Sequence, residues 1–155
     1  MPRSKSTQVV QVGIIVKDVE ETAKRLERLI GIGPFRIFEP QYRDLTYRGK
    51  TGRFRVKIGL AMAGTVQIEL AQPLSGKTVW GEYVKRKGYG LHHLAIPTDN
   101  MSQSVRKMNS KGFKVIQSGN RRGTGWVYLD CENELGVVFE LIAHGKRSQC
   151  VINDG

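Results

Sequence analysis

Four polar side chains occupy matching places in the two halves of the sequence, and together they offer the donor atoms of a metal site. Gln11 and His93 each lie in an apolar segment typical of a first strand, whereas Glu69 and Glu140 lie in segments typical of a last strand. Two carboxylates, an imidazole and an amide oxygen suit a borderline divalent ion such as Zn²⁺, Co²⁺, Ni²⁺, Fe²⁺ or Mn²⁺. A single glutamate or histidine in a strand would mean little, so the prediction depends on all four positions agreeing with one repeat.

That repeat appears when the sequence is shifted by 82 residues, which places segment 11–26 on segment 93–108. Each segment begins as an apolar strand and continues into an amphipathic helix that follows a capping residue. The predicted helix caps are Asp18 and Asn100, and the matching last strands are 65–73 and 136–144. Each half is therefore expected to fold as β-α-β-β-β.

Strand alternation predicts that the four polar side chains point to one common face. Successive side chains in a strand point to opposite faces, and the residues flanking Gln11, Glu69 and Glu140 are apolar residues expected to pack under a helix. If the two sheets curl toward each other, the four side chains meet in a cleft. By the same alternation, His92 should share the helix-packed face with Leu94 and Ile96, as a structural residue.

One domain is expected to span residues 1–155, because its length suits a single core. The linker's apolar residues predict a short amphipathic helix, and the polar, basic segment 40–52 predicts a lid or a binding loop. The predicted parts are module one (about 8–73), the linker (74–89), module two (about 90–145) and a flexible tail (146–155).

The chain is basic, with 25 Lys and Arg against 14 Asp and Glu and a net charge of +11. A positive field attracts anions, but no helix combines a basic stripe with aromatic residues, so nucleic acid is not the expected partner. No apolar segment is long enough to span a membrane and no signal peptide is evident, so we expect a cytoplasmic protein without a membrane partner. The two cysteines, Cys131 and Cys150, are expected to be free thiols.

Three basic residues are predicted to bind an anionic substrate. Arg55 and Lys57 alternate onto one face of "RFRVKIG" and would reach a substrate carboxylate if that face lines the cleft. The alternative is a solvated edge strand with protective charges. Arg122, in the glycine-rich segment "GNRRGTGW", would hold a phosphate or carboxylate, unless this segment is a plain β-turn.

Four segments resemble the vicinal oxygen chelate superfamily, which includes glyoxalase I, methylmalonyl-CoA epimerase, extradiol dioxygenases and antibiotic resistance proteins. They are "VVQVGIIVKDVEETAKRLERLIGIGPF", "VQIELAQPLSG", "GLHHLAIPTDNM" and "GVVFELI", and the resemblance covers about residues 8–145. It implies an α+β fold in which two β-α-β-β-β modules form an open curled barrel around one divalent metal ion. It also implies a homodimer as a possible assembly. The implied metal ligands are Gln11, Glu69, His93 and Glu140.

The ligand set is similar to that of glyoxalase I, whereas the length, the linker and "GLHHLAI" look most like methylmalonyl-CoA epimerase. The epimerase has a histidine where this chain has Gln11, and a catalytic glutamate where "RFRVKIGLAMA" offers only Arg55 or Lys57. The resemblance therefore implies a lyase or isomerase resembling lactoylglutathione lyase. Such an enzyme removes a proton α to a carbonyl through a metal-stabilised enediolate, with Glu140 as ligand and base.

Other members of the superfamily imply other functions. One alternative is an epimerase-like enzyme on an acyl-CoA, and another is a metal-free protein that binds a small molecule such as an antibiotic. A ring-cleaving dioxygenase would resemble a His, His, Glu ligand set, which only His93 fits. For the enzyme alternatives, the implied partner is an anionic small molecule, either a thiol adduct or an acyl-CoA.

Overall fold

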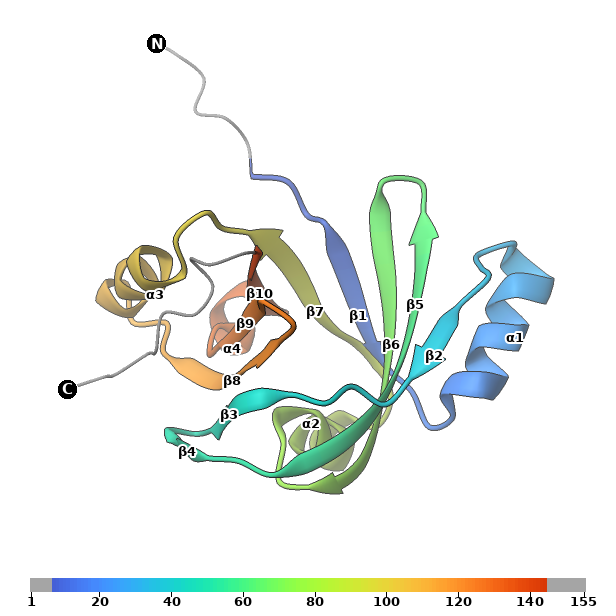
Figure 1. The fold of residues 1–155 in the computed structure, drawn as a ribbon, viewed down its shortest axis with the longest axis horizontal. Helices are drawn as coiled ribbons and strands as arrows, with labels where there is room; N and C mark the ends of the chain where they lie inside the picture. The colour runs from blue at the N-terminus through green and yellow to red at the C-terminus, as the bar shows by residue number, and fades with distance from the viewer. Residues whose placement is uncertain (1–6, 145–155) are drawn as a thin grey trace, which may run out of the picture.

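The computed structural model describes residues 7–144, whose strands form one 10-stranded sheet in the order β2-β5-β6-β1-β7-β10-β9-β8-β3-β4 (Figure 1). The strands of the first half are β1 (Gln11–Ile15), β2 (Arg36–Phe38), β3 (Arg43–Tyr47), β4 (Lys50–Thr51), β5 (Phe54–Ala63) and β6 (Val66–Gly76). Those of the second half are β7 (Gly90–Pro97), β8 (Val115–Arg121), β9 (Thr124–Leu129) and β10 (Val138–His144). The helices are α1 (Val19–Ile30), α2 (Val79–Lys87), α3 (Met101–Ser110) and α4 (Glu132–Leu135).

The sheet curls into an open half-barrel, as the two-module prediction requires, and this confirms the predicted α+β fold class. Its centre consists of the four strands predicted to hold the polar side chains. Strand β1 pairs in parallel with β6 and antiparallel with β7, and β7 pairs in parallel with β10. Gly13 on β1 lies opposite both Glu69 on β6 and His93 on β7. First and last strands therefore meet in the middle of the sheet.

Helices α1 and α3 cover the outer side of the two halves (Figure 1). Each begins where predicted, because the Asp18 side chain accepts a hydrogen bond from Glu21 N and the Asn100 side chain accepts one from Gln103 N. Their apolar stripes pack on the sheet, with Val19 and Ala23 against Leu70 in one half and Met101 and Val105 against Leu141 in the other. The concave side of the sheet is thereby left free of α1 and α3.

Helix α2, in the predicted linker, closes one end of the half-barrel. Its Trp80 is only 2% exposed and packs with residues of both halves, including Ile58 on β5 and Trp126 and Tyr128 on β9. Trp80 Nε1 donates a hydrogen bond to the Tyr128 hydroxyl over 3.2 Å. The linker therefore supplies a buried floor to the concave side.

The segment predicted to be a lid or binding loop is mostly sheet. Strand β3 pairs antiparallel with β8, so residues 43–47 of the first half extend the sheet of the second half. The physical reason is that β8 would otherwise present an unpaired edge. The prediction of a lid was wrong for β3 and β4.

Some predictions fall outside the part of the chain that can be described. These are the tail 146–155 and Cys150. Cys131 is buried as a free thiol. Over residues 7–144, no helix is long and apolar enough to cross a membrane.

Candidate functional site

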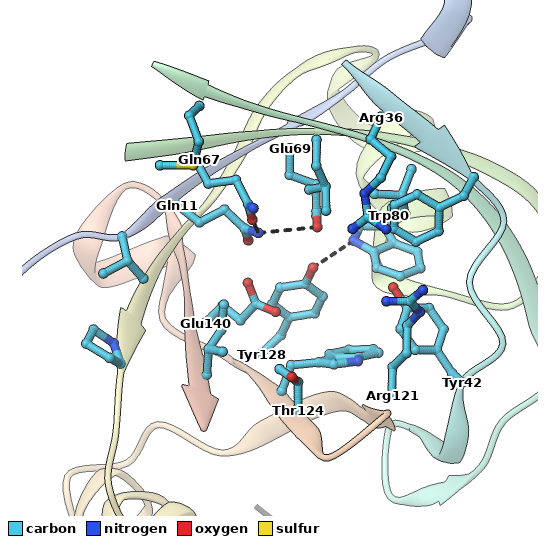
Figure 2. A pocket seen from close by; sticks show the side chains of 18 of the residues that line it. Gln11, Arg36, Tyr42, Gln67, Glu69, Trp80, Arg121, Thr124, Tyr128 and Glu140 are labelled. Carbon is cyan, nitrogen blue, oxygen red and sulfur yellow. Dashed lines mark hydrogen bonds between the residues drawn. The ribbon is translucent and has the colours of Figure 1, made fainter. Parts of the chain in front are cut away.

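A cavity of about 610 Å³ opens on the concave side of the sheet and is lined by both halves of the chain (Figure 2). Its wall includes Gln11, Gln67, Glu69, Trp80, Tyr128 and Glu140. This volume is typical of a site for a small molecule. Three of the four predicted metal ligands therefore line one cavity, and the fourth, His93, lies just behind its wall and is 1% exposed.

The Nε2 atom of His93 is the point on which the other three predicted ligands converge. Gln11 Oε1 lies 3.2 Å from it, Glu140 Oε2 lies 3.2 Å from it and Glu69 Oε1 lies 3.6 Å from it. Strand alternation had predicted this common face, and the sheet order places the four strands next to one another. The structure thus brings all four predicted ligands together.

The ring of His93 lies over Gly13 on the neighbouring strand β1. A β-carbon built on Gly13 would overlap the atoms of this ring. Gly13 is therefore required for a close approach of side chain to backbone. The residue that makes room for the imidazole is one that the sequence did not mark as functional.

The amide of Gln11 is oriented by a second glutamine. Gln11 Nε2 donates a hydrogen bond of 2.8 Å to Gln67 Oε1 and one of 3.5 Å to Glu69 Oε2. With the amide nitrogen engaged on β6, Gln11 Oε1 is turned toward His93. Gln67 was placed on this face by strand alternation, but its role is visible only in the hydrogen bonds.

His92 lies on the concave side, next to His93, and the prediction that it faces the helix side was wrong. The pairing of β7 with β1 shifts by one residue at this point, so that Gly13 pairs with His93 and Ile14 with Leu91. Such a bulge puts two neighbouring side chains on one face. The His92 and His93 rings meet through their Nδ1 atoms at 3.0 Å. Tyr83 and Tyr128 hold the His92 ring by edge contacts with ring centroids 5.3 Å away.

The electrostatics of the cluster follow from burial and from the two carboxylates. Burial raises the pKa of Glu69 to about 7; His93 opposes this rise and Glu140 adds to it. Burial by itself would lower the pKa of His93, but Glu140 and Glu69 outweigh it, and the pKa of His93 is raised. Burial, together with His93 and Arg86, holds the pKa of His92 well below its usual range. The neutral form of His92 is therefore favoured, and its Nδ1 can accept a hydrogen bond from the Nδ1–H of His93.

The basic residues predicted to bind substrate do not line the cavity. Lys57 Nζ is 2.8 Å from Glu20 on α1, and Arg55 forms a 2.9 Å ion pair with Glu39. The alternative of an edge strand with protective charges is not met either, because β5 lies between β2 and β6 in the sheet. Arg122 is exposed, in the turn between β8 and β9, with φ of 49°.

Two other arginines line the cavity, Arg36 on β2 and Arg121 at the end of β8. Arg121 is the neighbour of the predicted Arg122, and Arg36 shares a strand face with Phe38. Alternation in "FRIF" places Arg36 and Phe38 on one face of the strand. The sequence alone does not indicate which face of so short a strand lines the cavity.

The cluster is not a finished metal cage. Within the described residues, no group of three or more His, Cys, Asp or Glu side chains is arranged so that it could hold a metal ion. One of the donors here is an amide, that of Gln11, and the buried Glu140 Oε2 atom faces His93 Nε2 at 3.2 Å. A metal ion at this place would therefore be bound by a mixed donor set of two carboxylates, one imidazole and one amide oxygen.

The sequence profile of the glyoxalase/bleomycin resistance protein/dioxygenase superfamily matches residues 10–129. The chain belongs to this superfamily. Its members include both enzymes and small-molecule binding proteins, as the three parts of the name state. The profile spans the strands of Gln11, Glu69 and His93 and ends before Glu140.

Individual relatives within the glyoxalase/bleomycin resistance protein/dioxygenase superfamily are distant. An uncharacterised protein, YqjC of Bacillus subtilis (strain 168), is 21% identical over 133 residues, which cover 84% of this chain and 87% of that protein. Methylmalonyl-CoA epimerase from Mycobacterium tuberculosis has a similar structure, with a TM-score of 0.69, 19% identity and coverage of 94% and 93%. A methylmalonyl-CoA epimerase in complex with methylmalonyl-CoA and NH4+ has a TM-score of 0.65, 20% identity and coverage of 90% and 96%. At these identities the structures share the fold.

Proposed function

We propose that the chain is a divalent-metal-dependent enzyme that removes a proton α to the carbonyl of an anionic small molecule, in the manner of glyoxalase I. The observation that supports it best is the convergence of Gln11, Glu69 and Glu140 on Nε2 of His93 at the wall of the cavity. Three oxygen donors and one imidazole nitrogen are a ligand set for Zn²⁺, Ni²⁺, Co²⁺, Mn²⁺ or Fe²⁺.

The donor chemistry fits such an ion on two grounds. The cluster contains a buried carboxylate, Glu140, a second one that is 13% exposed, Glu69, and only one imidazole to balance them, and burying unpaired charge is costly. Donor atoms around one ion at about 2.1 Å stand roughly 3.0–3.4 Å from one another, close to the 3.2 Å and 3.6 Å measured around His93 Nε2. Gln11, Glu69, His93 and Glu140 would hold the ion, which when bound would polarise the substrate carbonyl.

Glu140 is the residue suited to move the proton. Glu140 lines the cavity, and its buried Oε2 atom lies 3.2 Å from His93 Nε2. A carboxylate in a shielded site can take up a proton from a carbon acid and return it. Tyr42, Tyr128 and Trp126 line the same cavity and would keep water away from the carbanion-like state.

The set of carboxylates favours a one-base isomerase or lyase over a two-base epimerase. In the described chain, the cavity is lined by two carboxylates, Glu69 and Glu140, and both belong to the proposed ligand cluster. An epimerase that removes a proton on one face and returns it on the other needs a further acid. The similarity to methylmalonyl-CoA epimerase structures keeps epimerisation of an acyl-CoA as the second candidate.

The metal is tested first. Purified protein is stripped with a chelator and titrated by calorimetry with Zn²⁺, Co²⁺, Ni²⁺ and Mn²⁺ separately. We expect about one ion bound per chain for at least one of these metals, and loss of this binding in His93→Ala. Glu39→Ala, which removes an exposed carboxylate outside the cavity, should bind like the wild type. If none of the four metals binds at about one ion per chain, the proposal is contradicted and a metal-free binding protein is favoured.

The contact of His92 with His93 predicts a role in orienting the ligand. His92→Phe keeps the ring and its edge contacts with Tyr83 and Tyr128 but removes the Nδ1 acceptor. Partners that orient a ligating histidine are typically worth about 10–100-fold in metal affinity. We expect a loss of this size in calorimetry, with the thermal stability of the metal-free protein changed little. Unchanged metal affinity would show that His92 only fills space.

A further inference from the structure

Two arginines at the cavity, Arg36 and Arg121, have no carboxylate partner among the described residues. Arg25, Arg48, Arg55, Lys57, Arg86 and Lys87 all form ion pairs. Within residues 7–144, no ion pair includes Arg36 or Arg121, although both line the cavity. Their charges are therefore available to a ligand.

Both guanidinium groups lie against the same ring. The Cζ atom of Arg36 is 4.5 Å from the centroid of Phe38, and the Cζ atom of Arg121 is 4.7 Å from it. The two arginines come from β2 and β8, which lie in different halves of the sheet. Like charges gathered at one place repel unless an anion lies between or beside them. Phe38 thus acts as a platform that holds two unneutralised cations at one end of the cavity.

The same cavity contains a buried donor without an acceptor. Trp126 lines the cavity and is 7% exposed, and its Nε1–H has no hydrogen-bond partner among the described residues. A buried donor left unpaired is costly, so such groups in folded proteins usually await a ligand or a water. Trp126 therefore places a buried, unpaired hydrogen-bond donor in the wall of the cavity that the two arginines also line.

The opposite end of the cavity has the opposite character. Figure 2 shows Gln11 and Glu140 on one side, Arg36, Arg121 and Tyr42 on the other, and Glu69 between them. Apolar side chains complete the wall, namely Ile58, Leu60, Met62 and Ile142. A ligand that matches this wall has an apolar body, an anionic group at the arginine end and its reacting carbon at the glutamate end.

We propose that Arg36, Arg121 and Trp126 form a subsite for an anionic oxygen group, and that the substrate is an acid rather than a neutral carbonyl compound. This rests on the proposed function for the position of the reacting carbon, whereas binding of the anion does not require a metal. A guanidinium pair matches either a carboxylate or a phosphate, so the probes must include both groups.

The test uses the fact that the chain has two tryptophans, Trp80 and Trp126, and both line the cavity. Metal-stripped protein is titrated with 4-phenylbutanoate, with 3-phenylpropylphosphonate and with the neutral 4-phenylbutanamide, and tryptophan quenching is followed. We expect one of the two anions to bind at least about tenfold more tightly than the amide. The tighter of the two identifies the anionic group.

The subsite is assigned by two matched substitutions. Arg36→Gln, Arg121→Gln and the double variant should reduce the preference for the anion to less than about threefold, with the amide bound as before. Arg122→Gln removes the same charge from the neighbouring exposed residue and should keep the preference. Circular dichroism checks that each variant is folded. If the double variant is unfolded, the two single variants decide the result.

Two results would overturn the subsite. One is equal binding of anion and amide by the wild type, or no quenching by any probe. The other is an anion preference that survives in all arginine variants or that falls equally in Arg122→Gln. If calorimetry finds no metal but the preference for the anion is lost only with Arg36 or Arg121, the metal-dependent function fails and the subsite stands.

Discussion

A Glu140→Gln variant is expected to lose proton exchange at the substrate α-carbon by about 10²–10⁴-fold, the usual contribution of a positioned general base. The amide keeps the shape of the side chain and an oxygen that can still act as a ligand, but it cannot take up a proton. Glu69 is the other carboxylate that lines the cavity in the described chain, so it is the alternative base that the experiment must test.

The measurement is deuterium incorporation from D₂O, followed by NMR or mass spectrometry at saturating metal. The two substrates are the glutathione hemithioacetal of methylglyoxal, for the lyase, and methylmalonyl-CoA, for the epimerase. Glu134→Gln is the matched control, because Glu134 is exposed on α4 and lies outside the cavity. Exchange that persists in Glu140→Gln while it is lost in Glu69→Gln would assign the proton transfer to Glu69.

Gly13→Ala is expected to abolish tight metal binding without removing any donor atom. The new β-carbon would overlap the His93 ring, so the ring has to turn away from Gln11 and Glu140. We expect metal affinity to fall by at least about 100-fold, the upper range for losing the support of a ligating histidine. Overpacking should also cost about 1–3 kcal/mol of unfolding free energy. Calorimetry and denaturant unfolding measure the two effects.

Gly52→Ala separates this effect from that of replacing a glycine in general. A β-carbon at Gly52 would have no neighbour closer than 3.6 Å, and its φ lies outside the left-handed region. This variant should keep both metal affinity and stability. Wild-type metal affinity in Gly13→Ala would mean that His93 is not the ligand, and the proposed ion site would have to move away from β7.

The common face of the proposed ligands could be predicted from the sequence because alternation in a strand is a local property. Gln11, Glu69 and Glu140 each stand between apolar neighbours, and an uninterrupted strand then leaves one choice of face. The repeat relates the strands in pairs, which predicted that they would meet. The first inference needs only neighbouring residues within one strand. The second needs only one comparison between the two halves of the chain.

The same rule failed at His92 because a bulge is decided by pairing between strands. The extra residue of β7 opposite β1 turns His92 onto the concave face. Nothing in "GLHHLAI" marks this shift. It changes the interpretation of His92 from a packing residue to a hydrogen-bond partner of His93.

The basic residues show the limit of a local pattern most clearly. Alternation placed Arg55 and Lys57 on one face, but only the packing of α1 decides that Lys57 meets Glu20 there rather than a ligand. Arg36 and Arg121 are 85 positions apart in the chain and meet on Phe38 because the sheet curls. Similarly, the basic segment after Pro40 could not be recognised as β3 without the β8 edge that pairs with it.

The sequence by itself therefore determined the β-α-β-β-β repeat, the helix caps and the face of the polar residues, because these depend on backbone geometry within one element or on symmetry between two halves. Only the tertiary structure decided which cations reach the cavity, how Gly13 admits the His93 ring and why His92 supports it. Those features depend on strand register and sheet curvature, which arise from the packing of distant segments and leave no periodic trace in the chain.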